Sequence, residues 1–495
     1  SGRPKEGQML RRTKIVATMG PATDDPKVLD EVIAAGVDVV RLNMSHGTHE
    51  DHERRAEWVR NRARASGRQV GVLIDLQGPK IRCGKFVDGK IDLAPDDRFV
   101  LDTGWDIDQG NGERVGVTYP TLHEEVARGD SLLLNDGHIV LWVDEVQDRE
   151  VRCKVVVGGT LSNSKGINKL GGGLSAPALT DKDKEDIEFA ARIEADYLAV
   201  SFVRAAEDVN IARQLLREAG GHGDIVSKIE RAEAMHCIEE IVDASDVIMV
   251  ARGDLGVEIG DAELPAAQKH LISTARQMNC VVITATQMME SMIQNPIPTR
   301  AEVFDVANAV MDGTDAVMLS AESAAGKYPV KAVEAMDRVC KEAEKQSETR
   351  QSHHRLHSVF GRIDEAIAMS TMYTANHLGV AAIAALTESG STCKWMSRIS
   401  SGIPIYALTS QVATRRKVTL FRGVYPVSFD LEPGIDSRQA NIEVIDELQR
   451  RGAVRDDDLV IITKGDLNGV SGGTNVMKIL RVGEHFPTDG QINFD

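Results

Sequence analysis

The sequence predicts an α/β protein, in which a (β/α)8 TIM barrel carries an inserted small β-barrel domain and is followed by a C-terminal open α/β sheet. Three observations support this prediction. Short β-branched runs alternate with segments of helical periodicity, a turn-rich stretch interrupts the third repeat, and a second alternating set follows a polar segment. At 495 residues the chain is also too long for one ordinary hydrophobic core.

Eight apolar runs have the length and residue types of buried strands. They are Lys14–Gly20, Val39–Ser45, Gly71–Gln77, Tyr197–Val203, Asp224–Glu230, Val247–Leu255, Val281–Met288 and Ala316–Ser323. Most of the connecting segments have the helical periodicity that crossovers between parallel strands require, for example Asp25–Ala35, His49–Ala65, Asp208–Ala219 and Pro265–Gln277. We therefore expect residues 10–77 and 176–345 to form a closed barrel.

Residues 78–175 follow a different pattern. Asp-Gly turns separate alternating runs, which include Ser131–Leu134, Ile139–Val143 and Val151–Val157. This pattern predicts a small all-β barrel inserted after the third strand, with Gly78-Pro79 and Pro177 as its hinges.

Residues 346–495 are predicted to form a third unit. Its strands are expected at Val380–Thr387, Pro404–Thr409, Val424–Phe429 and Asp458–Gly465, with helices between them. Alternating strands and helices of this kind favour an open α/β sheet.

Composition excludes several classes of protein. No apolar stretch approaches the roughly 20 residues of a membrane-spanning helix, and six scattered cysteines lack the spacing of a disulfide framework or zinc site. A soluble, cytoplasmic protein is expected. The net charge of −17 argues against nucleic-acid binding and requires any site for anionic metabolites to concentrate Lys, Arg or a metal. Residues 1–9 are expected to be an added tail, with Met9 as the native start.

Several of the predicted barrel strands end in polar residues. In a (β/α)8 barrel these positions form the rim at which catalytic residues lie. The two-residue period of a strand places Lys228 and Glu230 on a common face. The same period places Arg41, Asn43 and Ser45 on one face. Other predicted strands end at polar residues, which are Asp75, Asp254, Thr284 and Thr286.

Any one of these charged residues is better explained as a solvated or paired surface group. Together, however, Lys228, Glu230, Arg41, Asp75 and Asp254 would bury several ions at one rim without purpose, which is costly. The set therefore predicts an enzyme site. Two carboxylates without Cys or paired His favour Mg²⁺ or Mn²⁺, with Glu230 and Asp254 as ligands. A lysine beside such a metal suits phosphoryl transfer, because it neutralises charge on the transferred group.

Six motifs together resemble those of the pyruvate kinase family, over nearly the whole chain. They are Lys14-Ile-Val-Ala-Thr-Met-Gly-Pro21, Arg41-Leu-Asn-Met-Ser-His-Gly47, Gly78-Pro79-Lys80-Ile81-Arg82, Ser227-Lys-Ile-Glu230, Ala251-Arg-Gly-Asp-Leu-Gly256 and Ala285-Thr-Gln-Met-Met-Glu-Ser291. No single short motif has this specificity.

The resemblance implies a glycolytic enzyme that moves the phosphoryl group of phosphoenolpyruvate to ADP, giving pyruvate and ATP. Lys228 and Arg41 would neutralise the moving group, and Thr286 would take part in relaying a proton to the enolate carbon. Glu230 and Asp254 would hold the Mg²⁺. The implied substrate-binding set is Arg41, Lys228, Ala251, Arg252, Gly253, Asp254 and Thr286, and the implied nucleotide contacts are Asn43, His46, Arg82 and Lys182.

Two larger features also follow from the resemblance. The inserted domain would act as a lid that closes over the barrel mouth about Gly78-Pro79 and excludes water. The chain would assemble as a homotetramer.

The segment after Asp75 departs from the pattern of family members that need a monovalent cation. Such members resemble one another in a Thr-Lys-Gly-Pro-Glu sequence, whereas this chain reads Leu-Gln-Gly-Pro-Lys and ends at Lys80. The cation pocket of the family would correspond to Asn43, Ser45 and Asp75. We expect the Lys80 ammonium to serve this pocket, so that K⁺ is not required. The alternative is a solvated loop lysine.

A loop in the third unit resembles the effector-phosphate loop of the family. It contains Thr387, Ser389, Gly390, Ser391 and Thr392, with Lys464 and Gly473 on a second strand end and Arg398 nearby. Amides and hydroxyls after a strand suit an anion, so a sugar phosphate or nucleotide is the expected effector. Taken alone, the loop is equally well explained as a helix-capping turn.

Two other functions compete with this hypothesis. One is another phosphoenolpyruvate-handling barrel, such as a lyase or mutase, which would not need the inserted domain or the nucleotide contacts. The other is a catalytically silent metabolite sensor. The presence of Lys228, Glu230, Asp254 and Thr286 argues against a sensor.

Overall fold

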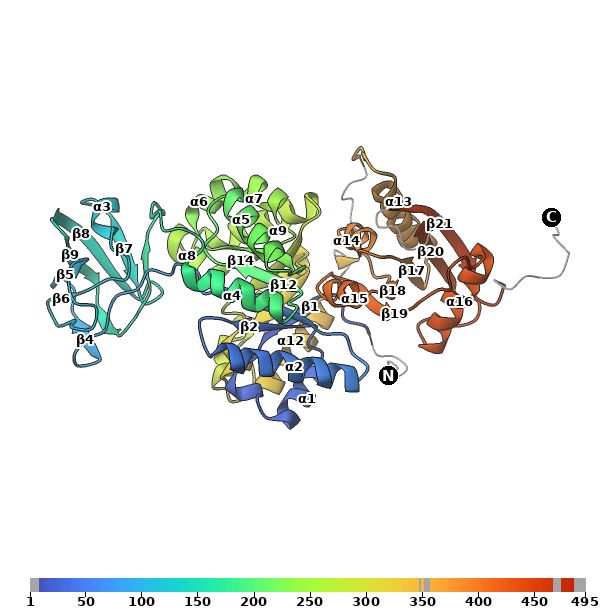
Figure 1. The fold of residues 1–495 in the computed structure, drawn as a ribbon, viewed down its shortest axis with the longest axis horizontal. Helices are drawn as coiled ribbons and strands as arrows, with labels where there is room; N and C mark the ends of the chain where they lie inside the picture. The colour runs from blue at the N-terminus through green and yellow to red at the C-terminus, as the bar shows by residue number, and fades with distance from the viewer. Residues whose placement is uncertain (1–8, 347–348, 351–356, 466–472, 485–495) are drawn as a thin grey trace.

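Three parts of the chain lie in a row, with the (β/α)8 barrel at the centre, the inserted β domain on one side and the C-terminal α/β unit on the other (Figure 1). The structure is a computed structural model, and it describes residues 9–346, 349–350, 357–465 and 473–484. Apart from Met9, the expected N-terminal tail lies outside the described residues.

Eight parallel strands close the central barrel in the order β1-β16-β15-β14-β13-β12-β3-β2. Their bounds are β1 Lys14–Thr18, β2 Val39–Asn43, β3 Gly71–Asp75, β12 Tyr197–Val200, β13 Asp224–Ile229, β14 Val247–Ala251, β15 Val281–Ala285 and β16 Ala316–Leu319. The predicted barrel is confirmed, and every strand begins at the predicted residue. The strands end earlier than predicted, because the polar residues that follow leave the ladder. For example, β14 ends at Ala251, and Arg252 already begins a helix.

Helices surround the barrel sheet. They are α1 Pro26–Ala35, α2 His49–Ala65, α4 Asp181–Arg192, α5 Ala206–Glu218, α6 Ala232–His236, α7 Ile238–Ala244, α8 Arg252–Ile259, α9 Leu264–Gln277, α10 Arg300–Asp312, α11 Ala321–Ala324 and α12 Pro329–Ala343, with 3-10 turns at Pro21–Thr23 and Glu290–Ile293. Capping boxes start several of them, such as Thr48 with Asp51 in α2. Their apolar faces pack on the outside of the sheet in one continuous core.

Between β3 and α4 the chain forms the small β domain. Its elements are β4 Lys90–Leu93, β5 Arg98–Asp102, β6 Arg114–Val115, α3 Leu122–Glu125, β7 Ser131–Leu134, β8 Ile139–Gln147, β9 Glu150–Val157, β10 Gly159–Ser162 and β11 Ile167–Lys169. The strands pair as one six-stranded and one two-stranded sheet around a single core. The inserted domain is therefore all-β as predicted, but its strands do not form one closed barrel.

The C-terminal unit is an open five-stranded sheet in the order β19-β18-β17-β20-β21. Its elements are α13 Ile363–Leu378, β17 Ala382–Leu386, α14 Ser391–Ser397, β18 Ile405–Thr409, α15 Val412–Val418, β19 Val424–Ser428, α16 Ser437–Arg450, β20 Leu459–Gly465 and β21 Thr474–Arg481. The four predicted strands are present. The sequence analysis missed β21, an antiparallel edge strand whose exposed and half-buried residues lack the apolar run of a buried strand.

A buried ion pair joins the barrel to this unit. Arg398 donates to both carboxylate oxygens of Asp315, at 2.5 and 2.8 Å, and each side chain is 1% exposed. It also donates to the carbonyl oxygen of Cys280 at 2.7 Å. The expectation that Arg398 supports an effector site is therefore wrong, because its guanidinium is used to dock the two domains.

No described helix combines the length and the apolar character needed to cross a bilayer. All six cysteines lie within the described residues, and none forms a disulfide.

Candidate active site

Polar residues from several strand ends line one cavity of about 220 Å³ at the barrel mouth. The structure brings ten of the sequence-predicted residues into its lining, namely Arg41, Asn43, Ser45, His46, Lys80, Arg82, Lys228, Glu230, Asp254 and Thr286. The strand ends meet there because all eight strands run parallel. Side chains that are far apart in sequence thus share one site.

Asp75 lies beneath the cavity and organises its two main cations. One carboxylate oxygen accepts from Arg41 Nε at 2.7 Å, and the other accepts from Lys228 Nζ at 3.0 Å. Asp75 itself is fully buried. Burial alone would raise the pKa of this carboxyl, but Lys228 and Arg41 lower it below its ordinary value. Asp75 is therefore charged and holds both cations at the cavity floor.

Lys228 is held by three oxygen groups. Its ammonium donates to Asp75 and, at 3.0 Å, to the Ser201 hydroxyl, and it lies 3.4 Å from Glu230 Oε1. Burial by itself would lower the pKa of Lys228, whereas Asp75 and Glu230 raise it above its ordinary value. The side chain is thus a fixed positive charge rather than a base, which suits charge neutralisation.

Glu230 and Asp254 are the two candidate ligands for a divalent cation, and both line the cavity. Burial and the neighbouring Asp254 raise the pKa of Glu230, even though Lys228 opposes the shift. The Oδ1 atom of Asp254 is buried and accepts no hydrogen bond from the described residues, although Lys80 Nζ lies 3.5 Å away. A cation bound between these oxygens would favour the charged form of Glu230 and give the Asp254 oxygen a partner. The all-oxygen donor set fits Mg²⁺ or Mn²⁺.

These two carboxylates are too few to form a complete cage. Across the described residues, no group of three or more His, Cys, Asp or Glu side chains could hold a metal. Mg²⁺ commonly uses one or two carboxylates and takes its other ligands from water and substrate phosphates. The residues present therefore fit a metal that binds together with substrate.

Thr286 occupies a strained backbone position beside the cavity. Its φ is +68°, and the next residue, Gln287, has φ +55°. A β-branched residue rarely adopts this region without a structural or functional reason. The Thr286 hydroxyl accepts from the Gly253 amide at 2.7 Å, and this bond fixes the strand-to-helix turn at the start of α8.

The comparisons with known proteins agree with this geometry. A family model described as "Pyruvate kinase, barrel domain" matches residues 10–333, and one described as "Pyruvate kinase, alpha/beta domain" matches residues 365–480. Pyruvate kinase II of Salmonella typhimurium is 57% identical over 96% of this chain and 99% of its own length. The pyruvate kinase of Haemophilus influenzae is 54% identical over the same shares, and that of Geobacillus stearothermophilus is 43% identical over 95% and 80%.

The chain belongs to the pyruvate kinase family. It is an enzyme of phosphoryl transfer from phosphoenolpyruvate to ADP, and the cavity at the barrel mouth is the candidate site for that reaction.

Some of the predicted pyruvate kinase site residues lie outside the cavity lining. Lys182, on α4, donates to the Met44 carbonyl oxygen at 2.8 Å and pairs with Asp186. Arg252 points toward α10 and pairs with Asp305 at 2.6 Å. The backbone of Ala251 and Gly253 forms the turn, but the Gly253 amide is already used by Thr286.

Six lining residues were missed by the sequence analysis, namely Leu76, Gln77, Ser201, Phe202, Met249 and Met318. Ser201 contacts Lys228, and the Phe202 amide donates to Glu230 Oε2 at 2.7 Å. Both residues directly follow the C-terminal end of β12, the position at which the predicted rim residues follow their own strands. That position could have identified them as site residues. It was not recognised because the predicted strand extended to Val203.

Lys80 enters the cavity from the β domain side of Gly78-Pro79. Its Nζ lies 3.5 Å from Asp254 Oδ1 and 3.9 Å from Asp136 Oδ1. It therefore pairs with a proposed metal ligand, while Asp75 pairs with Arg41 and Lys228.

The predicted effector loop is tied together by hydroxyl groups. The Gly390 amide donates to Thr387 Oγ1 at 2.9 Å, and Ser389 and Ser391 share a hydrogen bond of 2.9 Å. Thr392 donates to Thr474 Oγ1 at 3.0 Å, which links the loop to the start of β21, beside Gly473. The Lys464 ammonium donates to Ser437 and Asn441 on α16.

Proposed function

We propose that the cavity at the barrel mouth performs the transfer, with Lys228 and Arg41 neutralising the moving phosphoryl group. The observation that supports this assignment is the fully buried Asp75, which holds both cations at one floor. Two fixed cations beside two carboxylates are the arrangement that phosphoryl transfer needs. The test is formation of pyruvate from phosphoenolpyruvate and ADP, and its loss in Lys228→Met.

Glu230 and Asp254 would hold Mg²⁺ or Mn²⁺, which supplies a Lewis acid for the substrate's oxygens when bound. Thr286 is assigned to the proton relay that completes pyruvate. Its hydroxyl is held by the Gly253 amide, so its position does not depend on a flexible rotamer. His46, Arg82 and Asn43 line the same cavity and are assigned to the nucleotide.

The inserted β domain would act as the lid. Gly78 has φ +70°, and a Cβ atom there would lie 2.5 Å from Ser201, so only glycine fits at this connection. Closure about this point would exclude the water that could otherwise accept the phosphoryl group. The homotetramer and the cytoplasmic location stay predictions.

Lys80 supports the further proposal that the enzyme works without K⁺. Its ammonium lies in the same cavity as Asn43 and Ser45 and places a fixed positive charge beside Asp254. A charge built into the chain would replace the one that other family members take from solution.

We expect equal wild-type rates in K⁺-free and K⁺-rich buffer. Lys80→Met should lower kcat by about tenfold or more, because a charge-stabilising group of the site is lost. The matched control is Lys85→Met, an exposed lysine of the same domain. A large activation of the wild type by K⁺ would contradict the proposal.

The hydroxyl loop of residues 387–392 is proposed to bind an activating sugar phosphate or nucleotide. The hydrogen bond from Thr392 to Thr474 holds the loop after β17 beside the start of β21. An anion bound there would contact groups from both segments. Because Thr392 is buried, an exposed member of the loop, Ser389, is the better site for a disruptive substitution.

In a thermal-shift screen, a saturating effector should raise the wild-type Tm by about 3 °C. Ser389→Glu should abolish the shift by charge repulsion, whereas Ser273→Glu, an exposed serine on α9, should retain it. A shift that survives Ser389→Glu places the effector elsewhere.

A further inference from the structure

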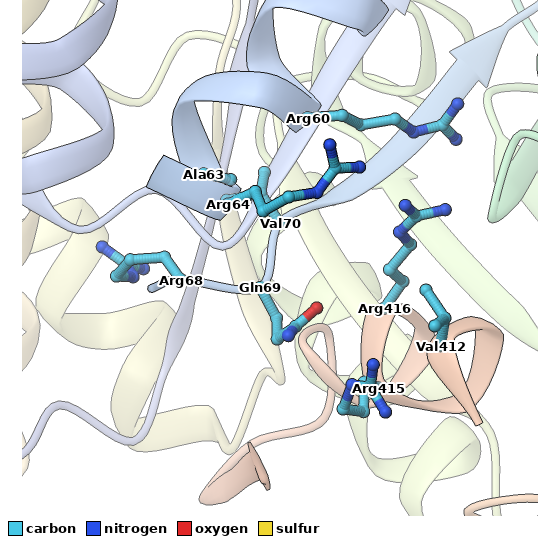
Figure 2. A pocket seen from close by; sticks show the side chains of 9 residues that line it. All are labelled: Arg60, Ala63, Arg64, Arg68, Gln69, Val70, Val412, Arg415 and Arg416. Carbon is cyan, nitrogen blue, oxygen red and sulfur yellow. The ribbon is translucent and has the colours of Figure 1, made fainter. Parts of the chain in front are cut away.

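A second cavity, of about 200 Å³, lies between the C-terminal end of α2 on the barrel and α15 of the C-terminal unit (Figure 2). Nine residues line it, and five of them are arginines. The nine are Arg60, Ala63, Arg64, Arg68, Gln69, Val70, Val412, Arg415 and Arg416. This concentration of positive charge runs against the net charge of −17 and calls for a compensating anion.

Three of the five arginines are built into the surrounding backbone. Arg60 donates to the carbonyl oxygens of Ile193 and Glu194, at 2.5 and 2.7 Å. Arg415 donates to the carbonyl oxygens of Thr409 and Ser410, at 3.0 and 2.9 Å. Arg68 donates to the carbonyl oxygens of Ile33 and Val37. These bonds fix the guanidinium groups. Arg68 also pairs with Asp38 at 3.6 Å, whereas Arg60 and Arg415 form no ion pair with the described residues.

The other two arginines have free guanidinium groups. Within the described part of the chain, Arg64 and Arg416 form no side-chain hydrogen bond and no ion pair. In Figure 2 the side chains of Arg60, Arg64 and Arg416 point toward a common space between the two helices, whereas Arg68 points away. The cavity therefore has donors directed into it from both domains.

Buried donors in the cavity also lack acceptors. The Nε atoms of Arg60 and Arg415 are buried and have no hydrogen-bond partner among the described residues. Arg415 is 9% exposed, so its unpartnered group is nearly removed from bulk water. An orphaned buried donor is costly, and an acceptor from a ligand would satisfy it.

The electrostatics of the cavity indicate unbalanced positive charge. Burial, with Arg416 adding to it, lowers the pKa of both Arg60 and Arg415. The carboxyl group that interacts with Arg60 and Arg416 is that of Asp196, but burial raises the pKa of Asp196 to about 6. Asp196 is therefore mostly ionised near pH 7 and supplies one buried negative charge beside a cluster of five arginines.

We propose that this cavity is a second anion site, which binds a small phosphorylated ligand carrying at least two phosphoryl groups. The planar guanidinium fork matches phosphate oxygens in paired hydrogen bonds. Guanidinium groups reach the cavity from both α2 and α15, so a ligand with two linked phosphoryl groups can contact both sides at once. The enclosed volume excludes a nucleic-acid strand.

The location gives such a ligand a structural consequence. α15 also carries Lys417, which pairs with Asp224 of β13 at 3.0 Å and whose carbonyl oxygen accepts from Tyr197. A ligand that bridges α2 and α15 would therefore tighten the contact between the C-terminal unit and the barrel. This site is separate from the hydroxyl loop at residues 387–392.

The test uses inorganic pyrophosphate as the probe, in Mg²⁺-free buffer, by isothermal titration of the full-length protein. Arg64→Gln/Arg416→Gln is the test variant, because neither guanidinium bonds to the described protein and the fold should not suffer. We expect its affinity for pyrophosphate to fall by about tenfold or more. The control is Arg62→Gln, an exposed arginine on the same helix that pairs with Asp30, which should bind as the wild type does.

Two further arms complete the test. Ser389→Glu should retain pyrophosphate binding, because the hydroxyl loop is a different site. Competition by a sugar bisphosphate would identify an organic source for the ligand, whereas competition by inorganic polyphosphate alone would identify an inorganic one. Equal affinities of the wild type and the double variant, or no binding by the wild type, would overturn the proposal.

Discussion

Lys228→Met should reduce kcat for pyruvate formation by at least about 10³-fold, because it removes a fixed cation from the charge that develops on the transferred group. The Lys228 ammonium is bound by Asp75 and Ser201 and lies beside Glu230, whereas Lys80, the other lysine of the cavity, lies beside Asp254. The coupled assay for pyruvate measures the effect directly.

Two controls separate this catalytic effect from a folding defect. Lys184→Met removes an exposed lysine from α4 and should leave kcat unchanged. In Lys228→Met, Asp75 keeps its bond to Arg41, so the circular dichroism spectrum should match that of the wild type. A folded Lys228→Met enzyme with more than a tenth of the wild-type kcat would show that Lys228 is not the neutralising group.

Arg398→Met should lower the free energy of unfolding by about 3–5 kcal/mol, because it leaves the buried Asp315 carboxylate without its cation. The carboxylate is 1% exposed and accepts two bonds from Arg398, and no water can replace them without opening the domain interface. Chemical denaturation should also show the C-terminal unit unfolding before the barrel.

An exposed ion pair of the same unit provides the comparison. Arg481 pairs with Glu484 at 3.7 Å, and both side chains are exposed, by 42% and 74%. Arg481→Met should therefore change stability by no more than about 1 kcal/mol. Similar losses in the two variants would mean that the buried pair does not hold the domains together.

The sequence predicted the barrel well because its strands are continuous apolar runs, and these runs begin sharply after polar turns. It also brought Lys228 and Glu230 to one site, since a strand repeats every two residues and parallel strands end at one rim. The edge strand β21 was missed because an edge strand does not need a buried, apolar pattern.

Other features could not be read from the sequence, because they depend on contacts between distant residues. The role of Asp75 as a bridge between Arg41 and Lys228 exists only once β2, β3 and β13 are parts of one barrel, with β12 between β3 and β13. In the same way, Arg398 resembled an effector contact by its place in the sequence, and only the docked barrel reveals Asp315 as its partner. The arginine cavity forms where α2 and α15 meet.

The most direct test of the central claim is an assay of the wild-type enzyme with phosphoenolpyruvate, ADP and Mg²⁺, in which each component is omitted in turn. If the cavity around Lys228, Glu230 and Asp254 transfers a phosphoryl group to a nucleotide, pyruvate and ATP form in equal amounts, and only when all three are present. Consumption of phosphoenolpyruvate without ADP would favour a lyase or mutase, and no turnover with all three components would favour a sensor. Either result would contradict the assignment.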